Sequence, residues 1–284
     1  MKIIRIALAP IFLMLLMPTH AVAATTLVWN SATTLKGQVV IPDGQSVLVA
    51  PNTKISVPDG TRITINGTLN APKGLSLTGK SWGGLVVVGS AEISNFQEAG
   101  ASTSFRVGPK GNLIIHGGNI SGIFGPSFVE GTLTADSLHY DKGEGGGINS
   151  NNGTGSISID HSVLTGAGKN SGDFFGLYGV KSISLTNSEM TGSHCAFHVL
   201  GLQNMQLDHD TIYGNSYGFM MYGSSTAGTK SITHTSIKNN DFGFDEGSAS
   251  THNGSIVIAQ STIQNNGQNL GLYTGKVRLV SHGK

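Results

Sequence analysis

The sequence has little charge, little proline and a single cysteine. Of its 284 residues, 12% are charged, 8 are proline and 1 is cysteine. So few charged residues exclude coiled coils and helical bundles, which are rich in Ala, Glu, Lys and Leu. The 38% of hydrophobic residues and the formal net charge of +1 argue against a disordered chain. Because one cysteine cannot form an internal disulfide, we expect the fold to depend on its core alone.

Glycine, by contrast, is abundant. There are 41 glycines, about twice the average share of roughly 7%. They show no three-residue period, which excludes collagen. A chain with this composition is typical of short strands separated by glycine-containing turns.

The first 23 residues have the organisation of a secretory signal peptide. Lys2 and Arg5 precede an apolar segment at 6–17, and the sequence Ala-Val-Ala at 21–23 matches an A-x-A cleavage site. The apolar segment is shorter than the roughly 20 residues needed to cross a bilayer, so we expect no membrane span. The sequence therefore predicts export to the periplasm or the extracellular space.

Cleavage after residue 23 would leave a domain at 24–284. Removing Lys2 and Arg5 changes the balance from 17 basic and 16 acidic residues to 15 and 16, a net charge of −1. Without a basic excess the sequence gives no support for a nucleic-acid partner.

An apolar octet recurs eight times between residues 86 and 263. Its third and eighth positions are apolar in every copy. The first and third positions alternate with polar residues, which is typical of a strand with one buried face. The copies begin at Val86, Leu113, Gly131, Ile157, Ile183, Met205, Lys230 and Ile256.

Such a short unit without a helix-length segment cannot bury its apolar face alone. Stacking of successive copies, about 4.8 Å apart, solves this problem. We therefore predict an all-β protein, a single right-handed parallel β-helix of roughly ten or eleven coils. We expect shorter coils at 24–85 and longer repeats at 86–284. After the later octets, Asn215, Asn240 and Asn266 align in a turn, where we expect a left-handed conformation.

The N-terminal part carries a more specific pattern. The segments Ile63–Ala71 (ITINGTLNA) and 82–85 (WGGL) follow one another within this part. Here the sequence resembles the opening coils of exported bacterial right-handed β-helix proteins of the pectin-lyase-like superfamily. The resemblance implies the architecture but no single reaction, because that superfamily contains lyases, hydrolases, epimerases, adhesins and proteins without known activity.

The residues that such enzymes use are scarce in this chain. Polysaccharide lyases of this fold generally use an Arg or Lys base, and residues 157–263 contain no arginine. The N-T-D, D-D, G-H-G and R-I-K motifs of polygalacturonase-like hydrolases do not occur in that order in this sequence. Asp208 and Asp210, about 6.6 Å apart along a strand, are the candidate acid and base pair. The alternative, which we favour, is a solvated strand residue followed by a turn residue.

Histidines occupy the fifth octet position in several coils. We expect this position to point inward and to place His209 and His234 about 5 Å apart in adjacent coils. Asn187 and Gln260 at the same position are poor metal ligands, so the pattern favours a hydrogen-bonded ladder over a zinc site. We interpret the nearby His194-Cys195 pair as a turn entering a strand. We expect no metal and no cofactor.

A second set of residues is predicted to lie on the outer surface of the later coils. Tyr178, His198, Asp245 and Tyr273 are the candidate ligand-binding residues, because sugar rings stack on aromatic side chains and their hydroxyls need polar partners. The alternative is that these residues pack under a loop. We therefore expect an exported, noncatalytic protein that binds a polysaccharide or another cell-envelope glycan. A divergent polysaccharide lyase or glycoside hydrolase and a structural or adhesive surface rod are the alternatives.

Overall fold

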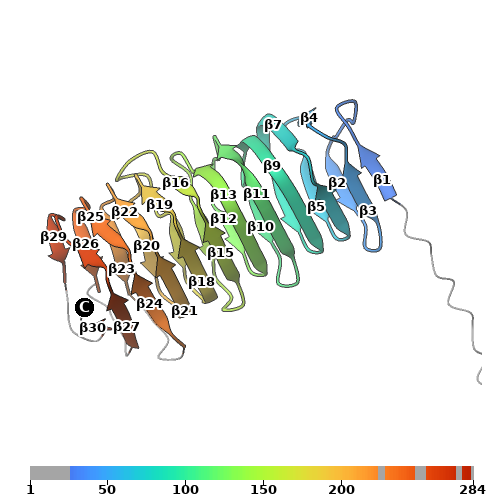
Figure 1. Cartoon of the computed structure of the whole chain (residues 1–284). Coiled ribbons are helices and arrows are strands. Elements are labelled where there is room, and N and C mark those ends of the chain that lie inside the picture. The colour runs from blue at the N-terminus through green and yellow to red at the C-terminus, as the bar shows by residue number, and fades with distance from the viewer. Residues whose placement is uncertain (1–25, 223–227, 247–253, 273–276, 283–284) are drawn as a thin grey trace, which may run out of the picture.

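The protein is a parallel β-solenoid of about 11 turns, which confirms the predicted all-β architecture (Figure 1). The computed structural model describes residues 26–222, 228–246, 254–272 and 277–282. The predicted signal peptide lies outside these residues and stays a prediction. Within the described ranges no helix is long and apolar enough to cross a membrane. The coils stack in chain order along one axis, so the two ends of the described chain lie at opposite ends of the row.

Each coil contributes strands to three faces. The third face is an 11-stranded parallel sheet with one strand from each coil. Its strands are β2 (Gln38–Ile41), β5 (Arg62–Ile65), β8 (Leu85–Val87), β10 (Phe105–Val107), β12 (Ser127–Val129), β14 (Ile148–Ser150), β17 (Phe175–Leu177), β20 (Cys195–Val199), β23 (Tyr217–Met221), β26 (Phe242–Asp245) and β29 (Gln268–Leu270).

The first and second faces form one 19-stranded sheet. The first face contains β1 (Thr26–Trp29), β3 (Ser46–Val49), β6 (Thr68–Ala71), β15 (Ser156–Asp160), β18 (Val180–Thr186), β21 (Leu202–Asp208), β24 (Lys230–Thr233), β27 (Gly254–Ala259) and β30 (Val277–His282). The second face contains β4 (Thr53–Ser56), β7 (Leu75–Trp82), β16 (Val163–Thr165), β19 (Glu189–Thr191), β22 (Thr211–Tyr213), β25 (Ser236–Lys238) and β28 (Thr262–Ile263). Three long strands continue from the first face into the second: β9 (Ser90–Ala101), β11 (Asn112–Ser121) and β13 (Thr132–Asp141).

The octets stack in register along the first face. Four predicted starting residues pair with one another in successive coils: Ile157, Ile183, Met205 and Lys230. The pairing of Ser231 with Val257 places Ile256 in the same register. Two predicted starts are wrong, since Leu113 pairs with Ala91 rather than Val86, and with Leu133 rather than Gly131. The two-residue period explains the second error, because a shift by two preserves the alternation. The first error arose because Val86 belongs to β8 on another face.

A left-handed residue ends the first-face segment of eight coils. Once the octets are in register, the fifth position has a positive φ in every copy, with values of 45–58° for the seven residues other than glycine. These residues are Asn95, Gly117, Ser137, His161, Asn187, His209, His234 and Gln260. The prediction that this position points inward was therefore wrong. The bend reverses the inside–outside alternation, so the fifth residue faces solvent and the sixth enters the interior.

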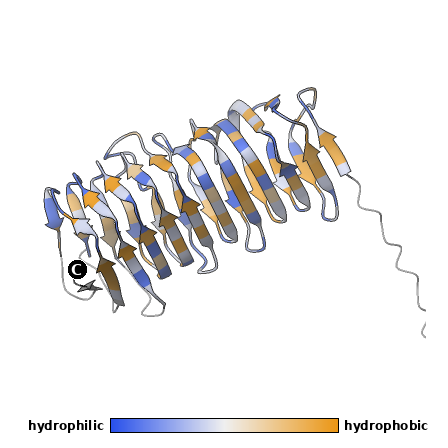
Figure 2. Cartoon of the chain, viewed as in Figure 1, coloured by the Kyte–Doolittle hydropathy of each residue, from blue (hydrophilic) through white to orange (hydrophobic). Residues whose placement is uncertain are grey.

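The interior is apolar and contains a column of stacked rings. Phe175, Phe197, Phe219 and Phe244 occupy equivalent positions on the third face and are fully buried. The rings of Phe197 and Phe219 stack with centroids 4.7 Å apart, and Phe175 lies 5.2 Å from Phe197. Figure 2 shows hydrophobic and hydrophilic residues alternating along many of the strands, as expected when each strand has one buried side.

Polar side chains line two interior corners of the later coils. At the sixth octet position, the Ser188 N–H donates to Asp210 Oδ1 over 2.9 Å, and the Asp210 N–H donates to Thr235 Oγ1 over 3.2 Å. At the next corner, the Asn215 N–H donates to Asn240 Oδ1, and the Asn240 N–H donates to Asn266 Oδ1, each over 3.0 Å. These ladders satisfy backbone groups at bends, where the strand pairing is interrupted.

The alignment of the three asparagines was correct, but their expected conformation was wrong. The left-handed residues of this corner are Gly214, Asn239 and Asn265, each one position earlier. Asn215 and Asn240 are instead buried and donate from Nδ2 to the asparagine of the next coil. Asn266 is partly buried and donates to Asn269 Oδ1 and to Ile237 O of the preceding coil.

Candidate functional site

The outer surface of the third face carries a cluster of aromatic, histidine and carboxylate side chains, which we call the third-face cluster. It is built from strands β17, β20, β23 and β26 and from the loop that precedes β17. Its members are Asp173, Tyr178, His194, Cys195, His198, Tyr217, Met220, Tyr222 and Asp245.

Strand register creates the column at the centre of this cluster. Gly176, His198, Met220 and Asp245 are consecutive partners in four adjacent coils. A Cβ atom at Gly176 would lie only 2.8 Å from Cε2 of Tyr178. The glycine therefore leaves room for the Tyr178 ring to lie beside His198.

Asp173 fixes the orientation of His198. The Asp173 Oδ2 atom lies 2.6 Å from His198 Nδ1, and Oδ1 lies 3.2 Å from His194 Nδ1. Burial raises the pKa of Asp173, but the hydrogen bonds from His198, Cys195 and His194 outweigh it and lower the pKa to about 2. The ionised carboxylate accepts the Nδ1–H of His198 and leaves Nε2 as an acceptor.

Two tyrosine rings enclose this imidazole. Tyr178 and Tyr222 meet His198 edge to face, with centroids 5.5 Å and 5.3 Å away. The Nε2 atom of His198 is buried and has no hydrogen-bond partner among the residues that the structure describes. A buried acceptor without a donor costs about 1–3 kcal/mol, so a ligand hydroxyl that reaches it would gain that energy.

A buried lysine anchors the loop that carries Asp173. Lys142, at the corner after β13, donates from Nζ to the carbonyl oxygen of Ser171, to Ser171 Oγ over 3.0 Å and to Gly145 O over 3.2 Å. Burial lowers the pKa of Lys142 to about 8, although Asp173 and Asp141 oppose this effect. The same loop reaches along the solenoid, where Lys169 forms an ion pair with Asp241.

The predicted ligand-binding residues differ in accessibility. Tyr178 is 39% exposed and His198 is partly exposed, as expected for an outer surface. Asp245 is only 8% exposed and accepts the Leu272 N–H at 2.9 Å, so it is not the exposed carboxylate that we expected. Neighbouring coils and side chains cover this end of the column. Tyr273 lies outside the described residues.

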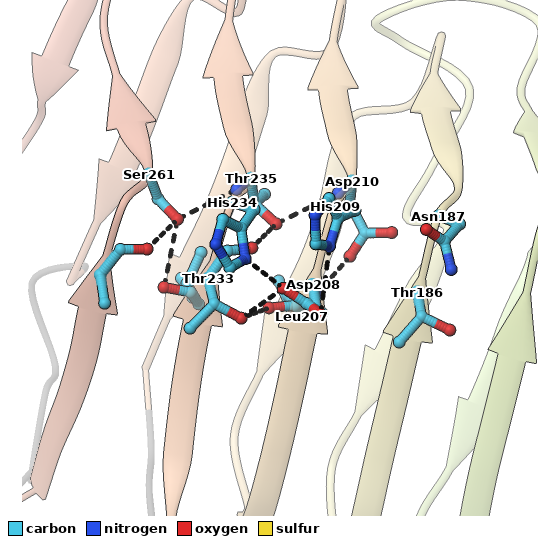
Figure 3. Close-up of polar contacts among 12 residues, drawn as sticks. Thr186, Asn187, Leu207, Asp208, His209, Asp210, Thr233, His234, Thr235 and Ser261 are labelled. Carbon is cyan, nitrogen blue, oxygen red and sulfur yellow. Dashed lines mark hydrogen bonds and ion pairs between the residues drawn. The ribbon is translucent and has the colours of Figure 1, made fainter.

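Asp208 and Asp210 do not share an outer groove (Figure 3). Asp208 lies at the surface, whereas Asp210 is 2% exposed and accepts the Asp208 N–H over 3.0 Å. Hydrogen bonds from Thr233 and His234 lower the pKa of Asp208 to about 2, whereas burial raises that of Asp210 to about 7. The candidate outer-face pair, which was the less favoured interpretation, does not form, because the left-handed His209 turns the chain between the two carboxylates.

Sequence reasoning placed Tyr222 near this column but missed Asp173 and Lys142. Asp173 lies in a loop outside the octets, and its contact with His198 joins residues of different coils. The repeat predicts that Tyr178 and His198 lie on one face. It does not predict the loop that reaches over them. No family model, curated protein or solved structure matches this chain.

Proposed function

We propose that the protein is exported and binds a glycan of the cell envelope, without catalysis, at the third-face cluster. The observation that carries this proposal is the buried, unpartnered Nε2 of His198 between Tyr178 and Tyr222. Tyrosine rings offer flat apolar surfaces to the C–H faces of sugars, and the imidazole nitrogen accepts a hydroxyl between them. The organisation of residues 1–23 supports export.

We also infer a relationship to the pectin-lyase-like superfamily. The succession of Ile63–Ala71 and the segment at 82–85 supports this relationship. Both segments lie in the opening coils of the solenoid, where the resembling proteins carry them.

A polysaccharide-cleaving activity is the second candidate, and the Asp173–His198 pair favours it. A carboxylate that fixes the Nδ1–H tautomer prepares Nε2 to take a proton, which is the arrangement of a general base. Lysines and arginines do not accompany this pair within the cluster, so the sugar-binding function accounts for more of its residues.

Retention on immobilised polysaccharides tests the proposal. Purified 24–284 is compared with Tyr178→Ala and His198→Ala on a panel of acidic and neutral polymers. We expect His198→Ala to weaken binding at least about fivefold, given the 1–3 kcal/mol of a buried hydrogen bond, and Tyr178→Ala to weaken it through loss of ring stacking. Tyr213→Ala, on the second face, is the matched control and should bind as the parent does. Circular dichroism establishes that the variants fold.

The same samples separate binding from cleavage. Reducing ends and the ultraviolet absorbance of unsaturated products are followed after incubation with each polymer. If the parent protein releases product and His198→Ala does not, the enzymatic proposal replaces the noncatalytic one. Absence of binding to every polymer, or equal binding by all variants, refutes a glycan site in this cluster and favours a structural rod.

A further inference from the structure

A compact group of metal-ligating side chains lies on a different part of the solenoid. Asp208, His209 and His234, which we call the Asp208 cluster, lie at the corner between the first and second faces (Figure 3). His209 and His234 are the left-handed residues of adjacent coils, with φ of 58° and 48°. Because the two bends are stacked, their rings lie parallel, with centroids 4.3 Å apart.

Both imidazoles turn the same nitrogen toward the carboxylate. Asp208 Oδ1 lies 2.9 Å from His234 Nδ1, and Oδ2 lies 3.2 Å from His209 Nδ1. Thr233 Oγ1 donates to Oδ1 over 2.6 Å and holds the carboxylate from the neighbouring strand. One ligand atom from each of the three residues lies within 4.8 Å of the others.

We propose that the Asp208 cluster is a binding site for Zn²⁺ or a divalent cation of similar chemistry. Two imidazole nitrogens and one carboxylate are a ligand set that Zn²⁺ accepts, with a water in the fourth position. Metal–ligand bonds of about 2.0–2.1 Å place ligand atoms about 3.3 Å apart in a tetrahedral shell. The two nitrogen–oxygen distances in the cluster are therefore already close to those of a bound ion.

Each imidazole can bind the ion through Nδ1 as the neutral ring, with its proton on Nε2. The side chains of His209 and His234 are 56% and 42% exposed, so solvent reaches both rings and the open coordination position. Nitrogen ligands exclude Ca²⁺ and Mg²⁺, which prefer oxygen.

The chain contains a natural control two coils away. Asp160 contacts His161 Nδ1 at 2.6 Å and accepts Asn187 Nδ2 over 2.9 Å and Thr186 Oγ1 over 2.5 Å. This group repeats the arrangement of the Asp208 cluster, but Asn187 occupies the position equivalent to His234. With only one imidazole, it lacks the third strong ligand.

Calorimetric titration with ZnCl₂ tests the site. The protein is 24–284 without a histidine tag, freed of metal by chelation. We expect His234→Asn to weaken Zn²⁺ binding at least about tenfold, since loss of even an outer-shell partner costs 10–100-fold. The variant should fold normally, because Asn187 adopts the same left-handed conformation, with φ of 51°.

Two further variants make the test specific. Asn187→His completes the second group, so the number of Zn²⁺ ions bound should rise by one. His198→Asn removes a ligand from the Asp173–Cys195–His198 group, the second such set among the described residues, and should leave the Asp208 site unchanged. The visible absorbance of bound Co²⁺ should disappear in His234→Asn.

Three results overturn the proposal. These are that the parent protein binds no Zn²⁺, that His234→Asn binds Zn²⁺ as tightly as the parent, and that His198→Asn alone abolishes binding. Because none of these readouts involves a polysaccharide, the proposal stands or falls separately from glycan binding.

Discussion

Glu98 provides the sharpest test of how the core tolerates a carboxyl group. This side chain of β9 points into the interior and is 2% exposed. Ser104 Oγ donates to its Oε2 atom, while Oε1 has no hydrogen-bond partner in the described part of the chain. Burial raises the pKa of Glu98 well above 4.5, and the bond from Ser104 offsets only part of this effect. The folded protein therefore keeps this group protonated at pH values where the unfolded chain has lost the proton.

The sign of the pH effect follows from this difference. Below the pKa of the unfolded chain, Glu98 is neutral in both states and leaves stability unchanged. As the pH rises toward the folded pKa, the unfolded state gains by ionising, and the free energy of unfolding falls by about 1.4 kcal/mol per pH unit. This slope continues only over the pH range in which the folded carboxyl stays protonated.

Glu98→Gln removes this ionisation and keeps the shape of the side chain. We expect the stability of the variant relative to the parent to increase as the pH rises above 5, by up to about 1.4 kcal/mol per pH unit, as measured by urea unfolding. Trp82 lies in the neighbouring coil and donates to Ala99 O over 3.1 Å, so its fluorescence reports on this region. If the unfolding transitions followed by fluorescence and by circular dichroism coincide, unfolding is two-state. Glu189→Gln, at an exposed site, is the control, and a Glu98→Gln difference that is constant with pH would refute the reasoning.

Three further predictions concern the column, the ladder and the loop. Phe197→Ala should lower the free energy of unfolding by about 3–5 kcal/mol in urea titrations, and a loss below about 1 kcal/mol would show that the ring column does not stabilise the fold. Asn240→Ala leaves the Asn215 N–H without its acceptor and should cost about 2–3 kcal/mol in the same assay; an unchanged midpoint would contradict a structural role for the ladder. Lys142→Met removes the contacts to Ser171, so amide exchange at 169–174 should accelerate while that of the core strands is unchanged. Equal exchange in parent and variant would mean that the lysine does not anchor the loop.

The repeat predicted the architecture because apolar spacing and strand pairing follow the same rule in every coil. The sequence could not show that His209 and its equivalents adopt a left-handed conformation. A single such residue reverses which side chains enter the core, so His209 was assigned to the interior and Asp210 to the surface. The register of the early octets was ambiguous for a related reason, since shifts by two residues preserve the alternation.

The candidate site was only partly accessible to the same reasoning. The repeat placed Tyr178 and His198 on the same face, but the register partner of His198 is Gly176, and the Tyr178 ring reaches His198 because that position has no side chain. The contact between Asp173 and His198 depends on the path of a loop with no counterpart in other coils. Burial of Asp245 depends in turn on the chain around Leu272, which no repeat pattern describes.

The ion pair between Lys169 and Asp241 has a consequence for how the solenoid opens. In a one-dimensional stack, each coil interacts with its immediate neighbours, so fraying proceeds from an end one coil at a time. Asp241 precedes β26, three coils beyond the loop that carries Lys169, and the Lys169 carbonyl also accepts a bond from Ser216. Each exposed contact is weak, of order 1 kcal/mol or less. Together they join coils that are not neighbours, so we expect opening of the β26 coil to be coupled to release of the loop that carries Asp173.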